Sequence, residues 1–363
     1  MAIKIRSQKD IFFNFTSLFF LHSFSCDLNF AMDSCLDFCL KFYNLFGFFL
    51  NFPINKKTIR EKVSKFWSFA VIIFNFASVV FFFSVFRTAK EIHFYIKVLA
   101  WCGVSVVCLT CIMILFDIIR QRNNEETFWR FAWRVENISR TFQGVKRFNL
   151  IMKFKISAVL IGFILAQLSI LVTAIVYEDE REFKLTLVGF IPKLIIWIFT
   201  TKFMYYVDVL SFVLQNLPLQ LSKYPLTKHD LQNFSRSYAI CWRMSQAINE
   251  IFAWGLVCTS MTTFLASFQS GHNLCKDIKN GEMRVISLIQ IIVTLSRAFV
   301  VSNSCENCLN QRSQLASSVF SINSKDHHEI IESLGLQLQQ QMISFEPFEL
   351  FTINHKNLLN VRL

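Results

Sequence analysis

Two cysteines and two histidines near the end of the chain are the residues whose types could bind a metal or carry redox chemistry. Cys305 and Cys308 form a C-x-x-C pair, and His327 and His328 follow further along. Thiolate and imidazole are ligands that Zn²⁺ prefers, but a structural zinc site normally combines two such pairs at regular spacing. A second pair at that spacing is missing from the sequence. We therefore expect these residues to have structural roles, with no bound metal or cofactor.

Other chemistry-bearing patterns are also missing from the sequence. There is no Gly-rich phosphate-binding loop, no H-E-x-x-H and no G-x-S-x-G pattern, and these patterns would supply phosphate binding, zinc-dependent hydrolysis and a serine nucleophile. The sequence therefore predicts a protein that is not an enzyme.

The composition instead indicates a membrane protein. Hydrophobic residues make up 53% of the 363 residues and charged residues only 17%, with 43 Phe and a mean hydropathy of +0.42. Soluble domains usually carry about 25% charged residues. The net charge of +12 could suggest nucleic-acid binding, but the Lys and Arg residues flank long apolar runs, where they mark membrane boundaries. We expect a lipid bilayer as partner and no nucleic acid.

Six apolar runs are long enough to cross a bilayer, which requires about 20 helical residues. They cover residues 67–86, 98–116, 156–177, 185–214, 251–268 and 285–301. The fourth run carries Lys193, Lys202 and Asp208, so we expect only its first two-thirds to lie in hydrocarbon. The sequence predicts an all-α membrane protein with a segment at 1–66, a six-span bundle at 67–301 and a further segment at 302–363. Residues 1–32 could precede the native start, since Met32 is an alternative to Met1.

Lys and Arg predict which way the spans point. They are concentrated before the first span and in the connections between spans two and three and between spans four and five. Such residues are retained on the cytoplasmic side, so the N-terminus is expected in the cytoplasm. With six spans, the C-terminus is cytoplasmic too.

The inner segments carry apolar residues at helical spacing, which predicts amphipathic helices. The three stripes are Phe128, Phe131, Val135, Ile138 and Phe142; Leu231, Phe234, Tyr238, Cys241 and Met244; and Ile331, Leu334, Leu338 and Met342. Thr227 is placed to cap the second helix. We expect the three helices to pack below the membrane as a cytoplasmic anchor bundle; the alternative is that they lie on the membrane surface.

Polar residues inside the spans are the candidate ligand site, because such residues are costly in lipid and tend to face a cavity or a partner. Lys193 stands beside Pro192 inside span four, and Arg297 near the inner end of span six could reach the headgroups or pair with Asp117 or Asp208. The expected pocket in the outer half comprises Trp101, Ser105, Gln167, Lys193, Thr262, Thr263 and Gln290. The alternative is ordinary hydrogen bonding between helices.

A C-terminal motif gives the sequence a family resemblance. Residues 336–359 contain a Q-L-x-x-x-x-I-x-F pattern, a Phe-rich turn and an I-N-x-x-x-L-L stretch, and they resemble the corresponding segment of insect gustatory receptors. The residues that carry the motif are Gln337, Gln339, Ile343, Phe345, Phe351, Ile353, Asn354, Leu358 and Leu359. The stretch at 44–53 and residues 249–252 are similar to two further elements of that family.

This resemblance implies a seven-helix receptor with a cytoplasmic N-terminus in the plasma membrane. It implies a homo- or hetero-tetramer, held by the anchor bundle and the seventh helix, that opens as a ligand-gated cation channel for small tastants. The family's pore helix would begin where this chain stops, at residues 360–363, so we expect the seventh span to be absent from the chain as written. The alternatives are an odorant receptor-like chemoreceptor and a non-conducting truncated accessory subunit.

Two other classes of membrane protein fit the sequence less well. A G-protein-coupled receptor would have its N-terminus outside, against the distribution of Lys and Arg. A secondary transporter would usually show helix breaks at corresponding places in two halves, and the sequence shows such a break only in span four.

Overall fold

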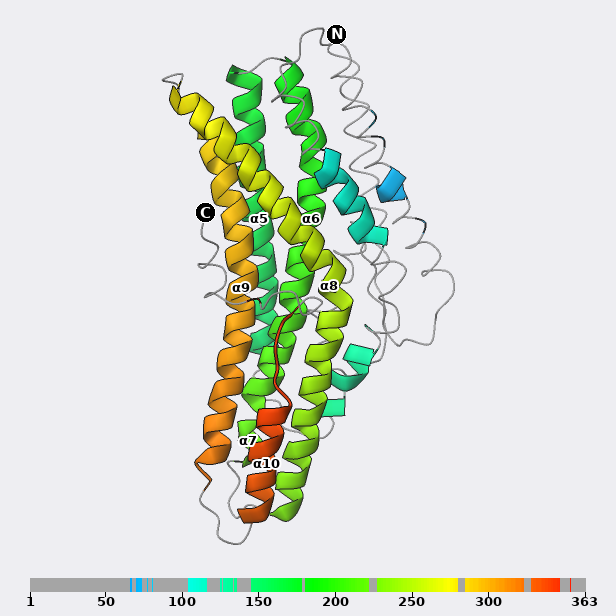
Figure 1. The fold of residues 1–363 in the computed structure, drawn as a ribbon, viewed down its shortest axis with the longest axis vertical. Coiled ribbons are helices and arrows are strands. Elements are labelled where there is room, and N and C mark those ends of the chain that lie inside the picture. The colour runs from blue at the N-terminus through cyan, green and yellow to red at the C-terminus, as the bar shows by residue number, and fades with distance from the viewer. Residues whose placement is uncertain are drawn as a thin grey trace.

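The computed structural model describes residues 66–80 and 125–135 in part, residues 104–115, 145–177, 180–221, 227–279, 285–322 and 328–346, and residue 353. The regular secondary structure in these ranges is helical throughout. Its larger helices are α5 (Val145–Tyr177), α6 (Glu180–Asn216), α7 (Pro218–Leu221), α8 (Lys228–Lys279), α9 (Val285–Phe320) and α10 (His328–Gln340). Figure 1 shows the long helices side by side in one elongated bundle, with α7 and α10 at the lower end.

Helix α6 forms the centre of the bundle. It packs against α5, α8 and α9, and 94% of its apolar window is buried, compared with 28% for α5 and for α9. Its sequence is apolar on all sides, as expected for a helix that is surrounded by protein. Pro192 lies inside α6 without ending it. The outer helices can therefore present apolar residues to lipid, while α6 supplies the protein core.

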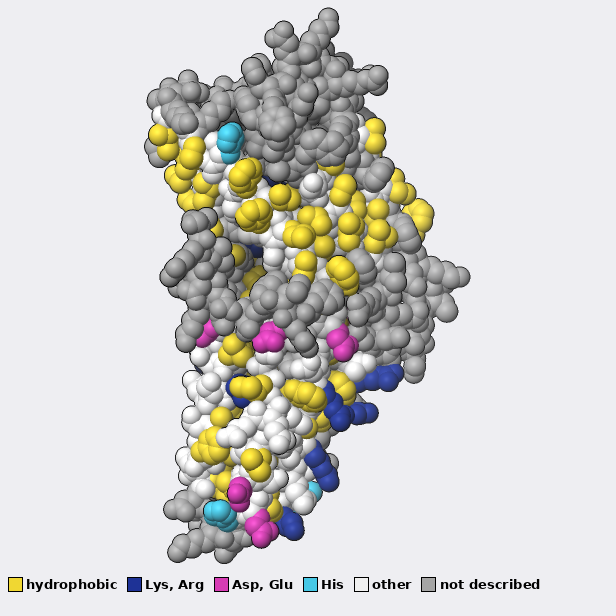
Figure 2. All heavy atoms as spheres, viewed as in Figure 1, with side chains coloured by type: hydrophobic (Ala, Val, Ile, Leu, Met, Phe, Trp, Pro, Cys, Tyr) yellow, Lys and Arg dark blue, Asp and Glu magenta, His cyan; other side chains and the backbone are white. Residues whose placement is uncertain are grey.

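The exposed surface changes character along α8 and along α9. On α8 the exposed side chains are polar as far as Glu250, whereas from Trp254 to Phe268 all but Ser260 are large and apolar. On α9 they are apolar as far as Phe299 and polar from Asn303 to Ser317, before the exposed Phe320 at the helix end. We call the two parts the apolar half and the polar half. Figure 2 shows hydrophobic side chains gathered over the upper part of the molecule and most of the visible Lys and Arg along the lower part. An apolar outer surface of this kind is typical of helices that face lipid.

The described helices confirm the prediction of an all-helical membrane protein. Four are long and apolar enough to span a bilayer, namely Arg147–Thr173, Gly189–Asn216, Lys228–Cys275 and Leu288–Phe320, and they contain most or all of the predicted spans three to six. A shorter apolar helix, Val104–Leu115, lies within the predicted second span. The first span is described only at scattered helical positions between 66 and 80. The predicted total of six spans stays a prediction.

The polar half contains the predicted amphipathic helices at 231–244 and 331–338, packed into the bundle. Of the predicted stripe before α5, Phe128 and Val135 are buried and Phe131 is half-buried, while Ile138 and Phe142 lie outside the described residues. All five stripe residues on α8 are buried: Leu231, Phe234, Tyr238, Cys241 and Met244. The Asp230 amide donates to Thr227 Oγ1 at 3.2 Å, so the predicted helix cap is confirmed. The expected third stripe is wrong at its end, because α10 stops at Gln340 and Met342 is exposed.

Candidate functional site

The predicted pocket residues differ in how deeply they lie in the apolar half. Gln167 on α5 and Thr262 on α8 are buried. Ser105, Lys193, Thr263 and Gln290 are half-buried. Trp101 lies outside the described residues.

An aromatic contact places Lys193 beside α5. The Phe163 ring lies 6.4 Å from the Phe190 ring and 5.3 Å from the Trp197 ring. Phe190 and Trp197 are one turn above and one turn below Lys193 on α6, so this stretch of α6 faces Phe163. Gln167 lies one turn further along the same buried face of α5, about 6 Å along the helix axis from the level of Lys193.

Side-chain contacts between α6 and α9 place Gln290 at the same level. Asn307 Nδ2 donates to Ser211 Oγ at 3.3 Å, joining residues 96 positions apart, and Asp208 and Ser304 share the same offset. Both helices run in the same direction (Figure 1) and have the same rise per residue. Residues of α6 and α9 that are 96 positions apart therefore stay at about the same level along the bundle. The offset places Lys193 beside Gln290, which accepts a hydrogen bond from Ser270 Oγ at 3.2 Å. We call Gln167, Lys193, Ser270 and Gln290 the polar level.

The two adjacent threonines have hydrogen-bond partners within their own helix. The hydroxyls of Thr262 and Thr263 donate to the Thr259 carbonyl at 2.8 and 2.7 Å. Thr263 Oγ1 also accepts a hydrogen bond from Arg297 on α9. Thr263 therefore takes part in a hydrogen bond between helices, which is the alternative role that the sequence indicated for these polar residues.

Arg297 is buried and contacts α8. Its Nη2 also approaches the Thr259 carbonyl at 3.5 Å, while Nε has no hydrogen-bond partner. The suggested pairing with Asp208 is wrong, because that carboxylate binds Lys155 instead. Asp117 lies outside the described residues.

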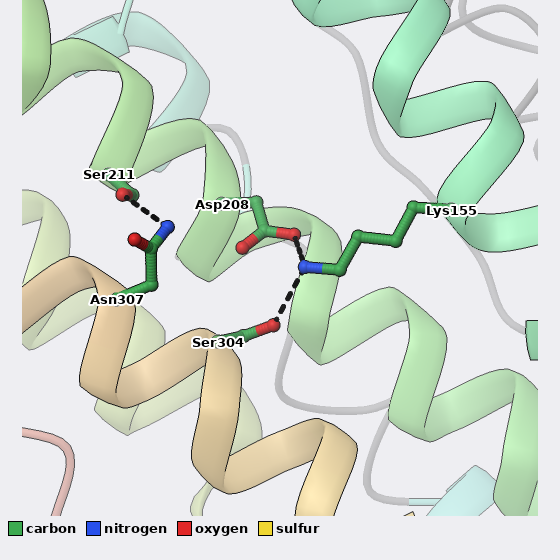
Figure 3. A network of polar contacts seen from close by, with 5 residues as sticks. All are labelled: Lys155, Asp208, Ser211, Ser304 and Asn307. Atoms are coloured by element: carbon green, nitrogen blue, oxygen red, sulfur yellow. Dashed lines mark hydrogen bonds and ion pairs between the residues drawn. The ribbon is translucent and has the colours of Figure 1, made fainter.

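A polar network joins α5, α6 and α9 (Figure 3). Lys155 Nζ on α5 lies 2.5 Å from Asp208 Oδ2 on α6 and donates to Ser304 Oγ on α9 at 3.1 Å. Asp208 is nearly buried, whereas Lys155 is 30% exposed. Asp208 stands out in the sequence as a charge inside a span, but the sequence does not identify Lys155 as its partner.

A second ion pair connects α6 to the segment before α5. Lys202 Nζ lies 2.8 Å from Glu125 Oε1, and both side chains are fully buried. Close by in sequence, Trp129 Nε1 donates to Tyr206 Oη at 3.2 Å, and the Phe128 ring lies 4.7 Å from the Tyr206 ring. The helical residues around 128 are therefore fixed against the buried centre of the bundle.

The C-terminal motif is bound along α8. The Gln337 side chain accepts from Ser235 Oγ at 2.7 Å and donates to the Ser235 carbonyl at 3.2 Å. Asn249 donates to the Ser344 carbonyl at 2.9 Å and accepts from the Glu346 amide at 3.2 Å.

The apolar residues of this motif complete its docking. Ile343 and Phe345 are buried in the core, and the Ile353 amide donates to the Phe345 carbonyl at 2.9 Å. Gln339 is exposed. The remaining motif positions lie outside the described residues: Phe351, Asn354, Leu358 and Leu359.

The C-x-x-C pair lies inside the packed bundle. Cys305 and Cys308 are fully buried on α9, and both belong to the main core. His328 is exposed and His327 lies outside the described residues. Within the described ranges, His, Cys, Asp and Glu form no cluster of three or more that could hold a metal.

Comparisons with known proteins match nearly the whole chain. The family model described as 7tm Chemosensory receptor matches residues 36–361. The fold is similar to that of the insect olfactory receptor OR5 from Machilis hrabei, with a TM-score of 0.63, 12% identity and coverage of 90% of this chain and 94% of that one. The structure of that receptor in complex with eugenol gives a TM-score of 0.60, 13% identity and coverage of 90% and 93%. No curated protein matches the sequence.

Proposed function

This chain belongs to the 7tm chemosensory receptor family, and we propose that it is a gustatory receptor, a subunit of a ligand-gated, non-selective cation channel that senses small tastants. The family membership and the olfactory-receptor fold support a chemoreceptor. The resemblance of the C-terminal motif to gustatory receptors is the reason to prefer taste to smell. In this chain the motif is bound along α8 through Ser235 and Asn249.

We propose that the receptor is a multi-pass protein of the plasma membrane with a cytoplasmic N-terminus. The division into an apolar and a polar half supports this orientation, because most of the visible Lys and Arg lie in the polar half (Figure 2) and such residues favour the cytoplasmic side. The polar half is then the anchor bundle, and the apolar half lies in the bilayer.

The proposed ligand site lies in the apolar half, between α5, α6, α8 and α9. Its proposed residues are Trp101, Ser105, Gln167, Lys193, Thr262, Thr263 and Gln290. Burial of Gln167 and the common level of Lys193 and Gln290 support it, because a ligand held there would contact three helices at once. Such a position would let binding change how those helices pack.

The proposed assembly is a homo- or hetero-tetramer held through the anchor bundle, with a seventh helix lining the pore. Large apolar side chains are also exposed in the polar half, where Phe320, Leu336 and Met342 are each more than half exposed. Such exposed apolar side chains support contacts between subunits. A non-conducting accessory subunit is the alternative proposal.

The observation that carries this proposal is the family match over residues 36–361. The test is expression of the full coding sequence, read from cDNA, in a heterologous cell with voltage-clamp recording. We expect sugars, bitter compounds or related tastants to evoke a cation current in cells with surface receptor. Silence across broad tastant panels, despite surface expression, would contradict the channel function.

An odorant receptor-like chemoreceptor is the second candidate. The solved structures with the same fold are olfactory receptors, but at 12–13% identity they support the fold alone. Volatile odorants that evoke larger currents than tastants would favour this alternative.

A further inference from the structure

The polar level combines one cation with neutral polar groups inside the apolar half. Lys193 comes from α6, Gln167 from α5, Gln290 from α9 and Ser270 from α8. Within the described part of the chain, no side chain forms a hydrogen bond or an ion pair with the Lys193 ammonium. This contrasts with Lys155 and Lys202, which both bind carboxylates.

The acidic side chains that the structure describes are distant from this level. The acids whose side chains the structure describes lie at or below the level of Lys202, where Glu125 is bound. Lys193 and Lys202 are nine positions apart in one helix, or about 14 Å along its axis. An ammonium group among apolar helices is costly unless an anion compensates it. Asp208 and Glu125 supply that anion for Lys155 and Lys202. The described residues supply none for Lys193.

The surroundings of Lys193 suit a molecule with an apolar body. Phe163 lies 5.3 Å from Trp197 and 6.4 Å from Phe190, ring centre to ring centre, and these three rings lie within about one turn of Lys193 along the bundle. Aromatic side chains of this kind bind the apolar part of a ligand, while a few polar groups fix its orientation. The amides of Gln167 and Gln290 can donate hydrogen bonds to an anionic oxygen.

From this arrangement we propose that the receptor recognises small carboxylic acids, whose carboxylate binds Lys193 and whose apolar body packs against Phe163, Phe190 and Trp197. Carboxylates are ionised at neutral pH and form charge-assisted hydrogen bonds with ammonium groups. The inference rests on the proposed function, because it names the ligand class of the proposed site.

Matched probes separate the charge from the apolar body. The full chain in phosphatidylcholine nanodiscs is tested by equilibrium dialysis with radiolabelled phenylacetate, phenylacetamide and phenethyl alcohol. These three molecules share a benzyl group and differ in the head group, which is an anion, a neutral amide or a hydroxyl. We expect phenylacetate to bind most tightly.

The variants then test Lys193 itself. Lys193→Met should weaken phenylacetate binding about 10- to 100-fold, the size of one charge-assisted hydrogen bond, and leave the two neutral probes unchanged. Lys193→Arg should keep the preference for the acid. Lys193→Gln also removes the charge, so it provides the same test if the methionine variant does not fold. Lys228→Met, at an exposed position in the polar half, is the matched control and should bind like the unmodified chain.

The outcomes distinguish this inference from the proposed function. Neutral probes that bind as well as phenylacetate, or acid binding that is indifferent to Lys193, overturn the carboxylate inference and leave a small-molecule receptor in place. Absence of phenylacetate binding overturns it too. Lys193-dependent acid binding without any ligand-evoked current in the expression assay supports the ligand class and contradicts the channel function.

Discussion

At the scale of single residues, Gly255 allows α8 to lie close against α6. A Cβ at this position would overlap the ring of Phe199, a fully buried side chain of α6. Glycine is normally unfavourable within a helix by about 1 kcal/mol relative to alanine. Its presence here is explained by packing, because a methyl group would push the Phe199 ring out of the core.

Gly255→Ala is therefore expected to lower the stability of the folded receptor. Overpacking of a well-filled core costs about 1–3 kcal/mol, and the Phe199 ring is held by its edge contact with Phe252 at 5.5 Å. The measurement is the thermal unfolding midpoint in detergent. Gly271→Ala is the control on the same helix, because a Cβ added there would meet nothing within 4 Å. Equal midpoints for the two variants would mean that Phe199 moves aside without cost.

The Glu125–Lys202 pair allows a second test at this scale. Both side chains are fully buried, so removal of one partner leaves an uncompensated charge in the core. Such a change typically costs about 3–5 kcal/mol, whereas replacing both partners is far less harmful.

We expect Glu125→Gln and Lys202→Met each to lower the unfolding midpoint more than the double variant does. The measurement is a double-mutant cycle on the receptor in detergent. Additive losses would show that the two charges are stabilised by other groups and that their contact contributes little.

At the scale of elements, the segment after α10 joins the C-terminal motif to α8. Its residues Ile343 and Phe345 are buried, and Asn249 holds the backbone on both sides of Phe345 through Ser344 and Glu346. A segment without regular secondary structure needs such partners, because its backbone groups would otherwise be unpaired when buried.

Asn249→Ala is expected to release this segment. Loss of both hydrogen bonds should accelerate amide hydrogen exchange from residue 343 to residue 346, while exchange within α10 changes little. Asn303→Ala, at an exposed site on α9, is the matched control. Unchanged protection in the Asn249 variant would mean that Phe345 packing alone holds the segment.

The sequence predicted these elements better than their contacts. Hydrophobic runs and stripes identified spans three to six and the buried face of α8, because apolar periodicity depends only on neighbours along the helix. The pairings Lys155–Asp208 and Lys202–Glu125 were not predicted, since they join side chains that are far apart in sequence. The end of α10 was also missed, because Met342 continues the apolar spacing although the helix has already stopped.

The candidate ligand site stays a prediction, and the sequence indicates its residues without indicating how they lie together. Lys193 attracted attention as a charge inside an apolar run, and this signal needs no structure. Its common level with Gln290, and the position of Gln167 about one turn away, follow only from how α5 and α9 lie against α6. The spacing within each helix does not contain this information. The sequence also assigned Thr262 to the site, and the structure adds that its hydroxyl donates to Thr259 in its own helix.

At the scale of the whole molecule, the change from apolar to polar surface on α8 and α9 defines one boundary. Trp254 on α8 and Phe299 on α9 are the exposed apolar residues next to it, and exposed polar side chains lie within one or two turns of both, on the side of the polar half. A membrane edge at this level would place the loop between α8 and α9 on the opposite side of the bilayer from α10. The proposed orientation makes that loop extracellular.

Labelling of Cys275 tests this orientation directly. Cys275 is exposed near the end of α8 that enters this loop, whereas Cys241, Cys305 and Cys308 are buried in the bundle. In intact cells, a membrane-impermeant maleimide should therefore label the receptor, and Cys275→Ser should remove most of that label. Labelling only after the membrane is permeabilised would place this loop in the cytoplasm. It would then invert the proposed topology, because α8 crosses the bilayer once and its Lys228 end would have to lie outside.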